Sequence, residues 1–124
     1  MIEDIINALK DSLQVVAPVY IGALDTKQIQ NSGSKIALNV YEINYNYEGD
    51  RPFATASISI LYWGADYFNA VERIKAQIYN TAFNQDSVVD AKIEKIVFSP
   101  VLQGGTLVGI KFVIKYYEET IRRI

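Results

Sequence analysis

Apolar and polar residues alternate between residues 53 and 63, and this period of two predicts a β-strand with one buried face. The expected buried face carries Ala54, Ala56, Ile58, Ile60 and Tyr62. The opposite face carries Thr55, Ser57 and Ser59. A half-buried strand of this length needs neighbouring strands and a layer to cover it.

A helix is expected directly after this strand, because the apolar spacing changes from two to between three and four. Gly64 and Ala65 turn the chain, and Asp66 is placed to cap the helix with its side chain. The apolar stripe consists of Phe68, Val71, Ile74, Ile78 and Ala82. The opposite stripe consists of Asn69, Glu72, Arg73, Lys75, Ala76 and Asn80. We expect the helix to lie on the sheet with the second stripe facing solvent or a partner.

The first part of the chain predicts a helix, a short strand and a polar loop. Residues 2–16 have the apolar spacing of an amphipathic helix, and Pro18 makes continuation beyond Ala17 unfavourable. Residues 19–24 are expected to form a short strand, and residues 25–35 a loop. Other expected elements are a strand at 36–47 that is central in the sheet, a turn at 48–52, a polar connection at 84–90, strands at 92–102 and 107–117, and a turn at 103–106.

The order of these elements predicts an α+β fold. Strands that follow one another closely form antiparallel pairs, and both helices need the apolar face of a sheet to cover them. We therefore expect one domain over residues 1–124, with a mostly antiparallel sheet, two helices packed on it and the order α-β-β-β-α-β-β. No internal repeat or linker indicates a second domain.

Composition excludes several classes of function. The 12 basic and 14 acidic side chains give a net charge of −2, so no nucleic-acid footprint is visible. The chain has no cysteine and no histidine, which removes thiolate chemistry, disulfides and the commonest general base and metal ligand. Glu3 and Asp4 stand where a signal peptide would carry positive charge, and no uncharged run reaches about 18 residues. We expect a soluble protein that is not exported.

No candidate for catalysis or metal binding survives inspection. The Gly104-Gly105 pair lies between two expected strands, where a hairpin turn explains it better than a phosphate loop. The neighbouring carboxylates Glu3-Asp4 and Glu118-Glu119 are near the ends of the chain, where burial is least expected. Asp86 and Asp90 lack the regular oxygen spacing of a calcium loop. We expect no enzyme activity, no cofactor and no metal.

The nine tyrosines and the polar loops are the remaining candidates for function. Tyrosine combines an apolar ring with a polar tip and is enriched at interfaces, but it is also a common strand residue. The tyrosines on expected strands are Tyr41, Tyr45, Tyr47, Tyr62, Tyr116 and Tyr117. The loop at 25–35 fits either a contact arm or a plain connection, and the cluster Gly49-Asp50-Arg51 fits either a contact point or a solvated turn.

In its order of elements the chain resembles the phage tail-completion proteins, also called tail terminators. The similar stretches are the helix at 2–9, the strand around Val19-Tyr20, the strand at 36–43, residues 56–71 and the closing strand at 109–119. Residues 56–71 carry the most telling pattern, since the strand ends in the aromatics Tyr62-Trp63 before a small-residue corner and an acidic cap. The resemblance covers nearly the whole chain and contains no catalytic signature.

This resemblance implies a structural role in a phage or prophage particle. Proteins of this family form a homo-oligomeric ring, commonly a hexamer, that caps the tail tube and joins it to the head connector or head-closure protein. DNA would only pass through the lumen, without sequence-specific binding, and no membrane is involved. The expected location is the neck of the virion, after assembly in the bacterial cytoplasm. Exposed loops would contact neighbours, and our candidate interface residues are Lys27, Gln28, Ile29, Gln30, Asn31, Glu48, Asp50 and Arg51.

Two alternatives remain open at the level of sequence. One is another neck or minor tail protein, such as a head-closure protein, since small α+β folds serve many roles. The other is a small-molecule-binding or enzymatic α+β domain with a pocket between helix and sheet.

Overall fold

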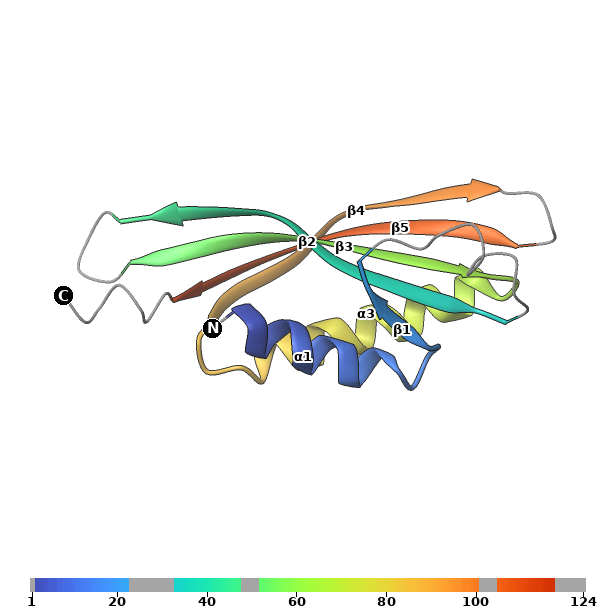
Figure 1. Ribbon diagram of the computed structural model, residues 1–124, viewed down its shortest axis with the longest axis horizontal. Helices are drawn as coiled ribbons and strands as arrows, with labels where there is room; N and C mark the ends of the chain where they lie inside the picture. The colour runs from blue at the N-terminus through green and yellow to red at the C-terminus, as the bar shows by residue number, and fades with distance from the viewer. Residues whose placement is uncertain (1, 23–32, 48–51, 101–104, 118–124) are drawn as a thin grey trace.

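A five-stranded sheet with two helices on one of its faces forms the protein (Figure 1). The computed structural model describes residues 2–22, 33–47, 52–100 and 105–117. The elements are α1 (Ile2–Leu13), β1 (Val19–Ile21), β2 (Lys35–Asn46), β3 (Phe53–Gly64), α3 (Tyr67–Phe83), β4 (Val88–Pro100) and β5 (Thr106–Tyr117). The predicted α+β class and the predicted order of elements are confirmed.

The strands lie side by side in the order β1-β2-β3-β5-β4. Only the β1–β2 pair is parallel, and the others are antiparallel, so the sheet is mostly antiparallel as predicted. β3 is flanked along its whole length, by β2 on one side and β5 on the other. β1 pairs only with Ile36, Ala37 and Leu38 of β2, so the expected central position of β2 holds over that part alone.

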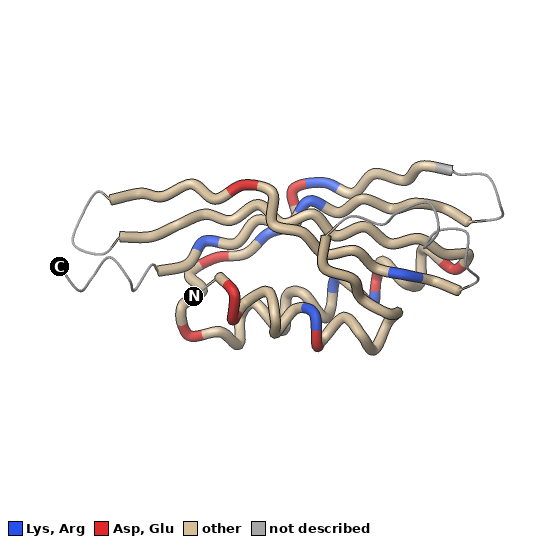
Figure 2. Tube along the Cα trace, in the orientation of Figure 1, with Lys and Arg blue, Asp and Glu red and all other residues tan. Residues whose placement is uncertain are grey.

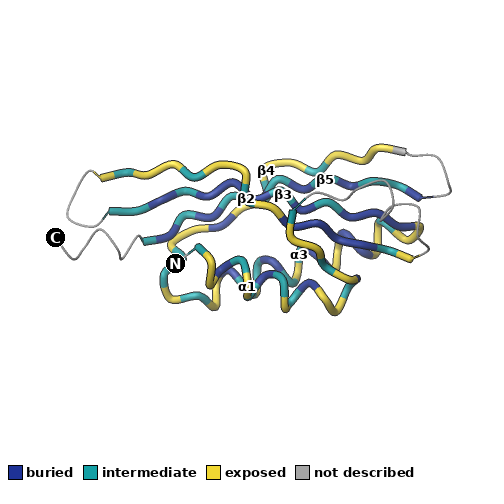
Figure 3. The backbone as a smooth tube through the Cα atoms, in the orientation of Figure 1, coloured by how far each residue is buried: buried dark blue, intermediate teal, exposed yellow. Residues whose placement is uncertain are grey.

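The core lies between the sheet and the helices (Figure 3). The predicted alternation of β3 is confirmed, since Ala54, Ala56, Ile58, Ile60 and Tyr62 are all buried. β5 contributes alternate residues from Val108 to Tyr116. The helices complete the core with Ile5, Leu9 and Leu13 from α1 and with Ala70, Val71, Ile74, Ile78 and Ala82 from α3. Each fully buried Ile or Leu contributes about 1.5–3 kcal/mol relative to an exposed one.

The start of α3 differs from the sequence prediction in two ways. Asp66 makes no side-chain capping hydrogen bond; its carboxylate accepts one from the Asn69 amide at 3.3 Å instead. Phe68 is 66% exposed and does not belong to the buried stripe. It lies at the margin of the arc that Val71, Ile74 and Ile78 define, where the helix surface turns away from the sheet. Its ring contacts other aromatics rather than the core.

Several element boundaries also differ from prediction. α1 ends at Leu13 rather than Val16, and the chain continues in a tighter turn in which the Val16 amide donates to the Leu13 carbonyl at 2.9 Å. β1 ends at Ile21, followed by Gly22 with a positive φ of 104°. The predicted strand end at 23–24 lies outside the described residues, as do most of the turn at 48–52 and the first half of the turn at 103–106.

The loop predicted at 25–35 and the connection predicted at 84–90 both end earlier than predicted, because the strands that follow them begin earlier. Lys35 is the first residue of β2, where it pairs with Trp63, and not the last residue of a loop. β4 begins at Val88 rather than residue 92, because Val88 and Asp90 pair with Tyr116 and Lys115 of the long strand β5. Val88 and Val89 favour a strand, and pairing with β5 extends β4 over them.

We predict that Gly64→Ala destabilises the fold by about 1–3 kcal/mol through overpacking. A Cβ atom at Gly64 would overlap the buried Tyr62 ring and would come within 2.9 Å of the Ser34 Cβ atom. Gly109→Ala is the matched control, since its Cβ would meet only a Leu61 methyl group at 3.5 Å. Urea unfolding of both variants measures the difference, and equal stabilities would contradict the overlap.

Candidate interaction surface

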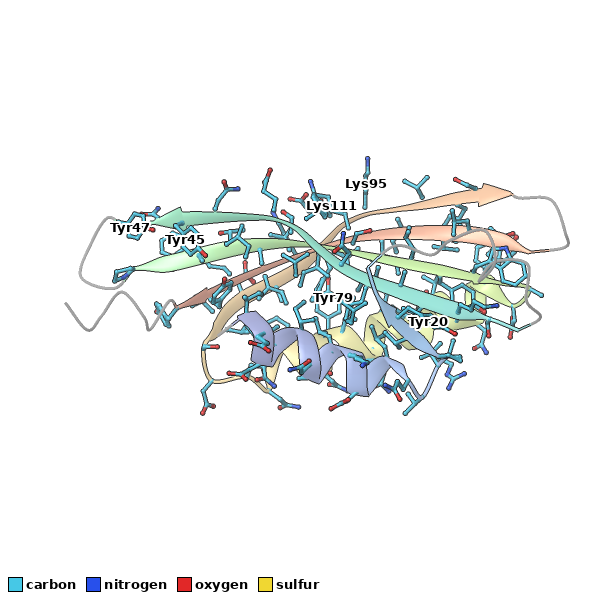
Figure 4. All side chains as sticks on the ribbon, viewed as in Figure 1. Tyr20, Tyr45, Tyr47, Tyr79, Lys95 and Lys111 are labelled. Atoms are coloured by element: carbon cyan, nitrogen blue, oxygen red, sulfur yellow. The ribbon has the colours of Figure 1, made fainter. Side chains whose placement is uncertain are left out.

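The sheet face that points away from α1 and α3 is not covered by any described element, and we call it the open face. It collects the strand residues that alternate with the core positions, including Ser57 and Ser59 of β3 and Gly109 and Val113 of β5. Figure 4 shows Lys95 and Lys111 pointing away from the helices on this face. The opposite side of the molecule, formed by α1 and residues 66–86, is called the helix side.

Charges are divided unequally between the two sides. On the helix side, the acidic residues Glu3, Asp4, Asp11, Asp66, Glu72 and Asp86 outnumber the basic residues Lys10, Arg73 and Lys75. On the open face, the accessible basic residues Lys92, Lys95, Lys111 and Lys115 outnumber the acidic residues Glu42, Asp90 and Glu94, whereas Lys35 is buried. Figure 2 marks these positions along the chain. Among the described residues, the helix side is therefore net acidic and the open face net basic.

An ion pair organises the middle of the open face. The Lys111 ammonium group donates to the Glu94 carboxylate at 3.0 Å, and Lys92 lies 4.0 Å from the other carboxylate oxygen. The Lys111 hydrogen bond lowers the pKa of Glu94 from its ordinary value. The same contact raises the pKa of Lys111, with the Tyr41 hydroxyl group acting in the same direction. Both groups are therefore charged at neutral pH.

A shallow groove of about 490 Å³ crosses the open face beside this pair. Its floor is formed by the small residues Ser59 and Gly109, and its walls by Tyr41 on one side and Lys95 and Val97 on the other. Tyr41 and Val97 are 49% and 47% exposed. The groove combines apolar side chains with a cation, which suits a protein surface better than an enclosed small-molecule site.

Exposed aromatic rings lie at two further places. Tyr67, Phe68 and Phe98 form a cluster with ring centroids 4.6–5.8 Å apart at the start of α3. Tyr45 and Tyr47 stack at the far end of β2, where Figure 4 shows them beyond the helices. The sequence did not identify the first cluster, because Phe68 was assigned to the core and Phe98 lies on a distant strand.

The tyrosines on the strands divide into core residues and surface residues. Tyr62 and Tyr116 are buried and belong to the core. Tyr41, Tyr45 and Tyr47 are exposed, as an interface role requires. Tyr79, in α3, was not among the strand tyrosines; its hydroxyl accepts from the Ile93 amide at 2.9 Å and ties the helix to β4.

The described carboxylates that the sequence offered as candidates for chemistry lie at the protein surface. Glu3, Asp4, Asp86 and Asp90 are all exposed, and no three metal-ligating side chains gather in the described part of the chain. The residues Gly104, Glu118 and Glu119 lie outside the described residues. No helix in the described ranges is long and apolar enough to cross a membrane.

All of the candidate interface residues from the two loops lie outside the described residues. These are Lys27, Gln28, Ile29, Gln30, Asn31, Glu48, Asp50 and Arg51. Their role stays a prediction. The structure instead draws attention to the open face, to which the sequence analysis assigned no function.

Comparison with known proteins gives matches by structure only. No family model matches the chain, and no curated protein matches its sequence. A chain in the virion of a native gene transfer agent particle matches with a TM-score of 0.61 and 10% identity, over 90% of this chain and 93% of that one.

Two further solved structures are similar. The type 4 fimbrial biogenesis protein PilO from Pseudomonas aeruginosa matches with a TM-score of 0.50 and 9% identity, over 94% of this chain and 69% of that chain. The sheath/tube terminator of an extracellular contractile injection system, PVC, matches with a TM-score of 0.43 and 11% identity, over 94% and 56%. The first match shows that the fold occurs, nearly end to end, in a virion. The PilO match shows that the fold also serves elsewhere, so the fold alone does not set the function.

We predict that Lys111→Met raises the pKa of Glu94 toward its ordinary value, because the lost hydrogen bond is the largest cause of the depression. A carboxyl NMR titration measures this shift. Since the folded pKa is lowered, any stability from the pair is present above the unfolded pKa and is lost as pH falls through the folded pKa. Lys115→Met is the control and leaves the Glu94 pKa unchanged. An unchanged pKa in Lys111→Met contradicts the assigned cause.

Proposed function

We propose that this chain is a structural subunit of a phage or prophage tail, which caps the tail tube as a homo-oligomeric ring and joins it to the head connector. The observation that carries the proposal is the fold match to a virion chain over almost the full length of both chains. The resemblance of the sequence to tail-completion proteins supports the same role independently of that match.

The surface of the molecule supports a role in assembly. Phe68, Phe83 and Tyr47 are each more than half exposed, and exposed aromatics are typical of protein interfaces. The space between helices and sheet is filled by core side chains, which weakens the alternative of a small-molecule pocket at that place. In the proposed ring, DNA passes through the lumen and the protein contacts the tail tube on one side and the head-closure protein on the other.

We predict that the purified chain stops the polymerisation of the tail tube protein encoded near its gene. Added below equimolar ratio, it shortens the tubes, and negative-stain images show ring density at one tube end. Native mass spectrometry gives the number of copies, for which we expect about six. Tubes that grow to the same length with and without the chain contradict the cap. Binding to the head connector without binding to tubes would instead favour a head-closure protein.

We further predict that the two loops identified from sequence contact neighbours in this assembly. The double variant Lys27→Ala/Arg51→Ala reduces tube capping, because each change removes a long cationic side chain from a loop. Lys27→Arg/Arg51→Lys keeps both positive charges, is the matched control and retains capping. Capping assays at several protein concentrations separate weaker binding from loss of binding. Wild-type capping by the double variant excludes these loops from the contact.

A further inference from the structure

We propose that the open face of one copy docks on the helix side of the next copy, so that a single repeated contact closes the ring. The inference rests on the ring proposed above and specifies its interface. The two surfaces lie on opposite sides of the same chain, and a contact between them is therefore heterologous. Heterologous contacts generate a closed ring when the rotation between neighbours divides a full turn.

Charge complementarity favours this pairing. The open face is net basic and the helix side net acidic, so like sides repel and unlike sides attract. A contact between two open faces would bring lysines together, and a contact between two helix sides would bring carboxylates together. The distribution of charge thus favours head-to-tail stacking over a symmetric dimer.

Lys95 is a lysine of the open face that has no ion-pair partner among the described residues. It pairs across the sheet with Lys111, and like charges directly opposite one another are unfavourable. Lys111 is neutralised by Glu94, whereas no carboxylate of the described residues lies within ion-pair distance of Lys95. A carboxylate from the helix side of a neighbour would satisfy Lys95. Asp11 and Glu72 are both exposed there, and Glu72 also lies 3.4 Å from the Lys75 ammonium group.

Apolar groups accompany the charges on both surfaces, as a stable contact requires. Exposed ion pairs by themselves contribute little, so most of the affinity must come from buried apolar and aromatic area. The open face offers the groove between Tyr41 and Val97. The helix side offers Val15, Phe68 and Phe83, which are 58–66% exposed. Aromatic side chains that enter a shallow groove are typical interface anchors.

The sheet edges suit an assembly contact less well. The outer edge of β4 is interrupted by irregularities between Val88 and Asp90 and between Ile93 and Lys95. The part of β2 that β1 does not cover has a similar irregularity between Val40 and Glu42. Bulges and charged side chains on edge strands hinder the pairing of strands from separate chains. The faces therefore remain the better surfaces for self-assembly.

The test uses two charge-reversal variants of the full chain. The open-face variant carries Lys92→Glu and Lys95→Glu, and the helix-side variant carries Asp11→Lys and Glu72→Lys. Each alone assembles about tenfold more weakly than the wild type, because like charges then face each other. Mixed together, they assemble again in strict alternation. Native mass spectrometry then shows equal numbers of the two variants, and therefore only even ring sizes.

Matched variants separate charge from side-chain packing. Lys92→Arg/Lys95→Arg and Asp11→Glu/Glu72→Asp keep every charge and assemble like the wild type. A chain that carries both reversals is again complementary to itself and also assembles. Circular dichroism confirms that each variant is folded. Raising the salt concentration from about 50 mM to about 500 mM weakens wild-type assembly if the contact is electrostatic.

The possible failures are distinguishable. Reversal variants that assemble like the wild type overturn the contact between open face and helix side and leave the proposed ring intact. A wild-type chain that neither self-associates nor rings the tube end, alone or with tail tubes, overturns the proposed function and this inference with it. If the wild type binds duplex DNA at low salt and the open-face variant loses that binding without change in assembly, the open face contacts nucleic acid instead.

Discussion

The burial of one face of β3 is the constraint on which the rest of the fold depends. β3 and β5 are the two strands with long neighbours on both sides, and the inward residues of β3 are small at Ala54 and Ala56 and branched at Ile58 and Ile60. Such a strand is stable only when a second layer excludes water from that face. α3 supplies part of this layer and is joined to β3 by the short corner at Gly64, so strand and helix are positioned together. α1 and the other strands complete the same core.

The parts of the fold that repeat a period were predictable from sequence. The alternation in β3 and β5 and the stripe from Val71 to Ala82 each identify an element and its buried face. The errors occur where the outcome depends on a single residue and not on a repeated pattern. Phe68 is apolar and nearly in phase with the stripe, but it lies just outside the arc that packs on the sheet, and the width of that arc depends on tertiary packing. The capping role of Asp66 failed for a similar reason, because its carboxylate had a competing donor in Asn69.

The candidate surface was less predictable than the fold, since it depends on which strands are neighbours. The alternation of β5 places Lys111 and Lys115 on one face from sequence alone. It does not reveal that Lys92, Glu94 and Lys95 lie beside them, because the register of β4 against β5 is not evident from the sequence of the turn between them. The aromatic cluster of Tyr67 and Phe98 is hidden for the same reason. The sequence analysis selected polar loops instead, because a polar loop can be identified from its composition without knowing which strands are neighbours.

The division of charge also bears on how a DNA-conducting ring is built from this chain. Lysines that face a lumen without partners would hold the phosphate backbone and hinder its passage. If the open face is covered by the acidic helix side of a neighbour, its lysines are neutralised within the protein wall and this face presents no basic surface to DNA. The same contact would place the two least similar surfaces of the molecule against each other, and such a contact does not favour a two-fold dimer. A net charge near zero for the whole chain is then compatible with strongly directional assembly, because direction depends on how the charges are separated and not on their sum.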